Sequence, residues 1–408
     1  MTSLLRRGLK YLSPSSSPAA SPTIPPSAPN DAPTTPSIPV GAAGFTTAPT
    51  STALFTPVNP AVDGEDCDRD CASCTIKYPA RFTVNYEDEL YGHVKGWATH
   101  VLVATGKTDW VRDVADEKGS VMEAIATGGV SASNGVLKLS ASNIPVPDEF
   151  YHHPRGEQPT TVLLLPAFTI VDHVTPALVP DLIKYFVDRS PTTTTPFSEV
   201  EQPADSLDSS KPGDSSPHIP EQEESTVCPS SSNAHTTTEQ PPFDLTSLGE
   251  SLPTPLRSRP CPHAAVILLC SQKTRDARCG QSAPLLRREF ERHLRPLGLH
   301  RDLADDRPGG VGIYFISHVG GHKYSANVIV YRRRDFEWFK EEKKKAEKHI
   351  EKGKSLKDEG AAQGIWLARV RPEDCEGIVR FTVLQGKVVK PGFQLRGGFD
   401  REKGLISW

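Results

Sequence analysis

Four residues in the C-terminal part of the chain have the types and spacing to form a metal site. Cys270 and Cys279 bracket a polar stretch of the sequence, and His318 and His322 bracket Val-Gly-Gly. Two thiolates and two imidazoles suit zinc, and they also suit a [2Fe–2S] cluster in which histidines replace two of the four cysteines. The two glycines matter as well, because they let the backbone approach a bulky inorganic centre without side-chain clash.

The spacing of these pairs leaves the identity of the metal open. Eight residues separate the two cysteines, whereas zinc fingers separate theirs by two to four. Rieske proteins interleave cysteine and histidine in each loop, whereas here the two pairs are segregated. Lys273, Arg275 and Arg278 in the cysteine loop favour thiolate and suit an anionic cluster. Zinc, iron–sulfur and no metal all remain open, and without metal Cys270 is a small buried apolar residue and His318 bonds a backbone carbonyl.

The elements that position these residues are read from apolar runs and helical spacing. The sequence predicts a strand, a helix, three strands and a helix in that order, which is an α/β arrangement compatible with a thioredoxin-like fold. The predicted ranges are residues 264–270, 284–294, 312–317, 327–331 and 364–370, with the last helix starting at Pro372. Cys270 then ends the first strand, and His318 follows the second.

The rest of the chain divides by composition. Residues 66–190 predict an N-terminal α/β domain with strands at 100–105 and 162–165 and helices beginning near Asp116 and over 180–188. Residues 191–258 are rich in Ser, Thr, Pro and acids, which predicts a long disordered linker to the thioredoxin-like ferredoxin domain at 259–408. Residues 1–65 predict a disordered tail, with order beginning near Asp66, and residues 335–357 predict a charged, solvated helix.

Charge and hydropathy exclude several classes of function. The net charge of −4 does not indicate a basic surface that binds nucleic acid. No run of about 18 apolar residues is present, so no membrane span is expected. Arg6, Arg7 and Lys10 precede the first acid, Asp31, and this composition is typical of a mitochondrial transit peptide, the alternative being a tail that lacks acids by chance. Without a secretory signal, the eight cysteines indicate a reducing compartment.

A second group of cysteines precedes the first predicted strand. Cys67, Cys71 and Cys74 are spaced Cys-x3-Cys-x2-Cys. Three interpretations stay open: structural thiols, a dithiol redox pair formed by Cys71 and Cys74, and part of a second metal site. His93 and His100 are the histidines nearest in sequence that could add a ligand. Cys228 lies in the predicted linker and is expected to be a free thiol.

The chain ends in Ile406, Ser407 and Trp408. A terminal aromatic residue with a free carboxylate is a recognition handle. The tripeptide resembles the signal by which cytosolic iron–sulfur proteins are recognised by their assembly machinery. The alternative is a tryptophan that packs on its own domain. Recognition of this kind favours the cytosol, whereas the N-terminal composition favours the mitochondrion, which we take as the first expectation.

Longer segments resemble a known family. The segments 74–79, 106–110, 317–331 and 364–374, together with the Cys-x8-Cys pair, resemble the sucrase/ferredoxin-like family, and within it the fungal altered-inheritance-of-mitochondria type. The resemblance covers both predicted domains. It implies a thioredoxin-like ferredoxin domain whose [2Fe–2S] cluster has two histidine ligands. Carried over by motif, the ligands are Cys270, Cys279, His318 and His322.

The resemblance implies a protein of electron transfer or redox sensing rather than an enzyme, with a redox partner that the sequence does not identify. Two other classes stay open: a zinc-binding structural domain, and a thiol–disulfide oxidoreductase that uses Cys71 and Cys74. A hydrolase is suggested only by the family's name, and the chain has no Gly-x-Ser-x-Gly motif.

Overall fold

A computed structural model describes residues 44–154, 156–197, 252–334 and 359–408. Helices and strands are mixed along these residues, so the predicted α/β class is confirmed. Within these ranges no helix combines the length and the apolar character needed to cross a membrane. The predicted charged helix at 335–357, the side chain of Cys228 and most of the predicted tail and linker lie outside the described residues.

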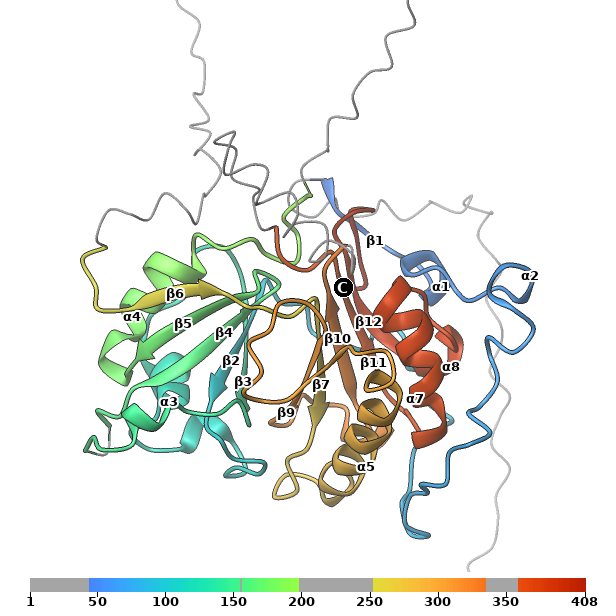
Figure 1. Ribbon diagram of the computed structural model, residues 1–408. Coiled ribbons are helices and arrows are strands. Elements are labelled where there is room, and N and C mark those ends of the chain that lie inside the picture. Colours follow the sequence, from blue (N-terminus) through green and yellow to red (C-terminus); the bar gives the residue numbers. More distant parts are fainter. Residues whose placement is uncertain (1–43, 155, 198–251, 335–358) are drawn as a thin grey trace, which may run out of the picture. The chain divides into compact units, whose positions relative to one another are not determined.

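One sheet runs through the described part of the chain and contains thirteen strands (Figure 1). In the order in which they lie across the sheet, the strands are β1 (Thr46–Thr47), β13 (Leu405–Ile406), β12 (Leu395–Asp400), β11 (Gln363–Leu367), β10 (Val328–Arg332), β7 (Ala265–Cys270), β9 (Val311–Ile316), β3 (Leu137–Ser142), β2 (Thr99–Ala104), β4 (Thr160–Leu165), β5 (Thr169–Val174) and β6 (Arg257–Pro260), and β8 (His300–Arg301) pairs with β9.

The predicted strands at 100–105, 162–165, 264–270, 312–317, 327–331 and 364–370 are confirmed within one to three residues at each end, as β2, β4, β7, β9, β10 and β11. β7 is apolar along its whole length and fully buried, as expected for a strand covered on both faces. It pairs antiparallel with β10 and parallel with β9, where Cys270 lies opposite Ile316. Because β7 and β9 are parallel, their C-terminal ends meet at one edge of the sheet, and the residues that follow them meet there too.

The two predicted domains share this sheet. β3 pairs antiparallel with β9 through Ser142 and Ile316. Beside that pair the Ala141 amide donates to Ser317 Oγ over 3.1 Å, and the Ser317 amide donates back to the Ala141 carbonyl over 2.9 Å. The described residues, from 44 onward, belong to a single compact unit. The division into domains at 66–190 and 259–408 stays a prediction, but the two segments meet at the end of β9, close to His318.

The long helix α5 (Ala277–Leu294) begins earlier than predicted. Asp276 is its N-cap, and its carboxylate accepts a hydrogen bond of 2.9 Å from the Arg278 amide. The sequence predicted a helix from Pro284 because the helical spacing of apolar residues begins there, whereas Pro284 lies inside α5. This correction places Cys279 on the first turn of a helix rather than after a flexible loop.

The other helices are short. They are α1 (Ser51–Leu54), α2 (Pro60–Asp63), η2 (Val114–Asp116), α3 (Val121–Thr127), η3 (Asp148–Phe150), η4 (Pro176–Leu178), α4 (Val179–Asp181), η5 (Leu182–Val187), η7 (His322–Tyr324), η8 (Pro372–Asp374), α7 (Cys375–Gly377), η9 (Ile378–Val383) and α8 (Pro391–Gln394). The helical runs predicted from 180 and from Pro372 are confirmed as α4–η5 and η8–α7–η9. The start predicted near Asp116 is wrong, because Ser120 caps α3 and accepts from the Glu123 amide over 3.1 Å.

Order begins before Asp66, contrary to the sequence prediction. Phe45 and Leu54 are buried, and β1 pairs in parallel with β13. The stretch is rich in Pro and Thr and shows no periodicity, so the local sequence could not predict its contacts with the C-terminal strand. At the ends of the predicted linker, Thr193 Oγ1 donates to the Trp97 carbonyl over 2.5 Å and Leu256 is buried.

Candidate metal centre

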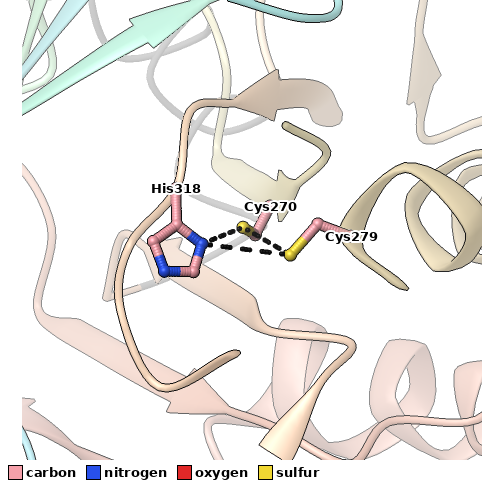
Figure 2. Close-up of side chains that lie close together, drawn as sticks. All are labelled: Cys270, Cys279 and His318. Atoms are coloured by element: carbon pink, nitrogen blue, oxygen red, sulfur yellow. Dashed lines mark hydrogen bonds between the residues drawn. The ribbon is translucent and has the colours of Figure 1, made fainter. Parts of the chain in front are cut away.

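Three of the four predicted ligands come together at the sheet edge where β7 and β9 end. Figure 2 shows the imidazole of His318 facing the sulfurs of Cys270 and Cys279. The two sulfurs lie 3.3 Å apart, and His318 Nδ1 lies 3.8 Å from Cys270 Sγ and 4.0 Å from Cys279 Sγ. Cys270 and Cys279 are buried and His318 is half-buried. His322 begins the turn η7, and its side chain lies outside what the structure describes.

Three different elements supply these side chains. Cys270 is the last residue of β7, Cys279 lies on the first turn of α5, and His318 follows β9 by two residues. The parallel pairing of β7 and β9 aligns Cys270 with Ile316. The cap at Asp276 turns the chain back after β7, so the first turn of α5 returns Cys279 to the end of that strand. The convergence therefore results from strand register and a helix cap.

The separations suit a tetrahedral centre. Ligand atoms bound to one tetrahedral ion at about 2.0–2.3 Å lie about 3.3–3.8 Å from one another. The observed distances of 3.3 and 3.8 Å lie at the limits of this range, and the distance of 4.0 Å lies just beyond it. A two-iron core with His318 on the second iron requires that imidazole to lie farther from the sulfurs. The donor set therefore fits thiolate-binding metals, and these distances are closest to the requirement of a single ion.

The two thiols share their ionisation. The hydrogen bond with Cys279 lowers the pKa of Cys270 to about 5, with further help from His318 and the Val319 amide, although burial opposes the shift. The same hydrogen bond raises the pKa of Cys279, and burial raises it further. Cys270 therefore ionises more readily than Cys279, and a metal ion that binds both sulfurs displaces the protons they hold.

Gln272 connects the cysteine loop to the histidine loop. Its side chain is buried, and its Oε1 accepts a hydrogen bond of 2.8 Å from the His318 amide. Its Nε2 donates to the Val111 carbonyl over 2.5 Å, and Ser271 Oγ donates to the Thr108 carbonyl over 2.9 Å. Gln272 thus holds the backbone of His318 against a loop from the N-terminal part of the chain.

Asp109 holds the cysteine loop from the outside. Its carboxylate accepts hydrogen bonds of 3.0 Å from the Thr274 amide and 2.8 Å from Thr274 Oγ1. Asp109 lies in Gly-Lys-Thr-Asp-Trp, one of the segments behind the family resemblance. No local pattern indicated a role for that segment. In the structure it supports the loop that joins Cys270 on β7 to Cys279 on α5.

Arg396 lies behind the histidine loop and is buried. Its Nη1 donates to the Gly320 carbonyl over 3.1 Å and to Asn327 Oδ1 over 2.7 Å, and its Nη2 donates to the His93 carbonyl over 3.1 Å. Burial lowers the pKa of Arg396 to about 10, so it stays charged at neutral pH. Gly320 and Gly321 both have positive φ, at 83° and 67°. The loop therefore closes onto a fixed cation.

A second cation, Lys138 on β3, lies on the same side of the sheet. Its ammonium group is 4.4 Å from the ring centroid of Trp366 and 5.3 Å from that of Trp97. Burial and the charge of Arg396 lower the pKa of Lys138 to about 7, while the charge of Cys270 acts in the opposite direction. Neither Lys138 nor Arg396 was singled out from the sequence, because no local pattern marks a basic residue that tertiary packing brings to a buried site.

The second cysteine group meets side chains that sequence proximity did not suggest. Cys71 Sγ lies 3.9 Å from His293 Nε2, and Glu376 also lies within reach of both. His100, which the sequence raised as a neighbour, is buried elsewhere and bonds Tyr331 Oη and Ser140 Oγ over 3.0 and 2.9 Å.

The C-terminal tripeptide is part of the sheet edge. Ile406 belongs to β13, and the Ser407 hydroxyl accepts from the Gly398 amide over 2.9 Å. Trp408 stacks on Trp97 with ring centroids 4.6 Å apart, and its carbonyl accepts from Thr47 Oγ1 over 3.0 Å. Recognition of the tripeptide by assembly machinery stays a prediction, and it would require these contacts to open.

Comparison with known proteins identifies relatives of this chain. Actin patches distal protein 1 of Saccharomyces cerevisiae is 51% identical over 69 residues, which cover 17% of this chain and 22% of that protein. Altered inheritance of mitochondria protein 32 is 34% identical over 128 residues in Clavispora lusitaniae and over 125 residues in Debaryomyces hansenii, covering 31% of this chain and 33% of each relative. The chain thus aligns with a third or less of the length of these curated relatives. No solved structure matches the chain.

The sucrase/ferredoxin-like family matches residues 90–397. That span includes the strands from β2 to β11, the start of β12, the cysteine loop and the histidine loop. The mitochondrial-inheritance relatives support the fungal type to which the sequence was compared. Because the match covers most of the chain, this protein belongs to the sucrase/ferredoxin-like family.

Proposed function

We propose that this protein binds a [2Fe–2S] cluster through Cys270, Cys279, His318 and His322 and serves in electron transfer or redox sensing. The observation that carries the proposal is the convergence of two buried thiols and one imidazole within 4.0 Å, in electrostatic range of two cations. The ferredoxin part of the family's name supports it.

The charges around the site favour a centre that gains an electron. A ferric cluster with two sulfides, two thiolates and two neutral imidazoles has no net charge, and its reduced form carries one negative charge. The buried guanidinium of Arg396 stabilises that added charge, and the protonated form of Lys138 does so as well. A zinc centre with the same ligands never changes its charge, so two nearby cations bring it no corresponding benefit.

When bound, such a cluster takes up and releases one electron. The chain's own residues do the rest. Cys270 and Cys279 bind through negatively charged sulfurs, and His318 binds through neutral Nδ1, which favours a higher potential than four thiolates, toward the Rieske range of about −150 to +300 mV. Gln272 fixes the backbone of His318, and Arg396 fixes the loop that leads to His322.

A zinc-binding structural domain is the second candidate. The distances among Cys270 Sγ, Cys279 Sγ and His318 Nδ1 favour it, because they approach those of one tetrahedral ion. In that case the metal would staple β7, α5 and the histidine loop together and carry no electron. The two candidates differ in metal, colour and redox activity.

Anaerobic purification of the full-length protein tests the proposal. We expect red-brown protein with two irons and two acid-labile sulfides per chain and visible absorption that bleaches on reduction. Cys270→Ser and His318→Ala should each remove most of the iron and the colour. Cys261→Ser and His300→Gln are matched controls, because both residues are buried outside this site, and both variants should keep the cluster.

Colourless protein with one zinc that is lost in Cys270→Ser would replace this proposal by the zinc-binding domain. Iron that persists in both ligand variants would reject the assigned site. His322→Ala tests the fourth ligand separately, and loss of iron comparable to His318→Ala is expected.

We also propose that the protein acts in mitochondria. The support is the basic, acid-free composition before Asp31 and the printed names of the mitochondrial-inheritance relatives. Import into isolated mitochondria tests this, with the full chain compared to a chain that lacks residues 1–43. Protease protection of the full chain and its loss on truncation are expected. Equal exclusion of both proteins would favour the cytosol.

A further inference from the structure

Cys71, His293 and Glu376 form a second cluster of metal-ligand atoms, which the proposed function does not use. Cys71 lies in the irregular segment before β2, His293 near the end of α5, and Glu376 on α7. One sulfur, one imidazole nitrogen and one carboxylate oxygen all lie within 4.8 Å of one another. Cys71 is buried, and the side chain of His293 is 13% exposed. Three segments that are distant in sequence thus present three different metal donors to one point.

The distances within the cluster suit a single ion. Cys71 Sγ lies 3.9 Å from His293 Nε2, and a carboxylate oxygen of Glu376 lies within 4.8 Å of both atoms. Atoms bound to one tetrahedral ion lie about 3.3–3.8 Å apart. Cys74 follows on the same turn, since its amide donates to the Cys71 carbonyl over 3.2 Å. Its thiol donates to the Ile76 carbonyl over 3.6 Å and lies outside the three-atom cluster. At the Cys-x-x-Cys spacing common in zinc sites it supplies a fourth ligand only by turning away from that carbonyl.

The cluster already attracts a cation. Arg292 Nη2 donates to Glu289 Oε2 over 2.8 Å, to His293 Nε2 over 3.0 Å and to Cys71 Sγ over 3.4 Å. Since a guanidinium can only donate, Nε2 of His293 must present its lone pair.

Arg292 does not block a metal ion permanently. Its side chain is 39% exposed, and its Nε also donates to Glu289 Oε2 over 2.9 Å. It can keep that pairing while Nη2 turns away from Cys71 and His293. A divalent ion that enters the cluster would thus take the place of the Arg292 guanidinium and bind Cys71 Sγ and His293 Nε2 directly.

We propose that Cys71, His293 and Glu376, with Cys74, hold a zinc-type divalent ion that staples the irregular N-terminal segment to α5 and α7. Between α2 and β2 the described chain has neither helix nor strand. An irregular segment of this length has few backbone hydrogen bonds of its own, and a structural metal compensates for that. The mixed thiolate, imidazole and carboxylate set suits zinc better than magnesium or calcium, which prefer oxygen. The site does not depend on what occupies Cys270 and Cys279.

Cobalt and zinc titrations of the full-length Cys270→Ser/Cys279→Ser variant test the site, because that variant lacks the thiols of the first one. Co²⁺ should bind with one equivalent per chain and give thiolate-to-cobalt charge transfer and intense tetrahedral d–d bands, and Zn²⁺ should displace it. Adding Cys71→Ser or His293→Gln should weaken binding at least about tenfold. Cys261→Ser and His300→Gln are matched controls that should leave the affinity unchanged.

Metal content provides the second measurement if the double variant does not fold. One zinc per chain is expected in otherwise unaltered protein, lost in His293→Gln and kept in His300→Gln, with iron unaffected in both. No cobalt band in the titration, or zinc retained in both Cys71→Ser and His293→Gln, would overturn the proposal. Loss of iron in Cys270→Ser concerns only the first site, so the two proposals fail separately.

Discussion

Gly321 faces the guanidinium of Arg396, and this contact yields a quantitative test of how the histidine loop is held. A Cβ at Gly321 would lie 2.5–2.7 Å from three guanidinium atoms. A Cβ at Gly320 would meet nothing within 4 Å. Both residues have positive φ, at 67° and 83°. Alanine therefore suffers backbone strain at both positions but a collision only at Gly321.

The strain and the collision have different magnitudes. Left-handed backbone costs a non-glycine residue about 1–2 kcal/mol, so Gly320→Ala should lower the free energy of unfolding by about that amount. Gly321→Ala must in addition displace Arg396 from bonds such as those to the Gly320 carbonyl and Asn327 Oδ1. Hydrogen bonds to charged groups contribute about 1.5–3 kcal/mol each. The loss of one such bond brings the total expected for Gly321→Ala to about 2.5–5 kcal/mol, a large part of a domain's stability.

Urea unfolding of both variants measures these costs, and metal retention through a desalting column measures the effect on the site. Gly320→Ala should keep most of its metal, while Gly321→Ala should lose it, because the loop carries both histidines. Replacing Arg396 by Ala should make the two alanine substitutions equally costly, since the collision is gone. If Gly321→Ala is no less stable than Gly320→Ala when Arg396 is present, the guanidinium does not hold the loop and the reasoning is wrong.

Three further outcomes are expected. Burial lowers the pKa of His263 to about 4, so the unfolded chain binds more protons than the folded chain between pH 6.5 and 4. The free energy of unfolding should therefore fall by up to about 3 kcal/mol as the pH falls through that range, and the fall should be smaller in His263→Gln. Gln272→Ala should cost about 2–4 kcal/mol and weaken metal retention, because it leaves the buried amide of His318 without its acceptor; wild-type retention would contradict this. Trp408→Ala should lower the free energy of unfolding by about 2 kcal/mol, roughly half the cost for a fully buried tryptophan, since Trp408 is half-buried against Trp97; a change below about 0.5 kcal/mol would show that the terminal contact is not stabilising.

The central strands could be predicted because their signal is local. β7, β9 and β10 are short apolar runs flanked by polar residues or glycine, and each was placed within a residue or two. Among the strands that the sequence did not predict, the short strands β1 and β13 were missed for the opposite reason. β1 and β13 have two residues each, and what makes them strands is their pairing with distant segments.

The residue types and spacing by themselves determined that Cys270, Cys279, His318 and His322 were the candidates for metal chemistry, because thiols and imidazoles are recognisable without coordinates. Only the tertiary structure decided that three of them converge, since that depends on the register of β7 against β9 and on the cap of α5. The same holds for the buried cations and for the cluster at Cys71. Charge and coordination act through space over a few ångströms, and sequence separation carries almost no information about which groups share that distance.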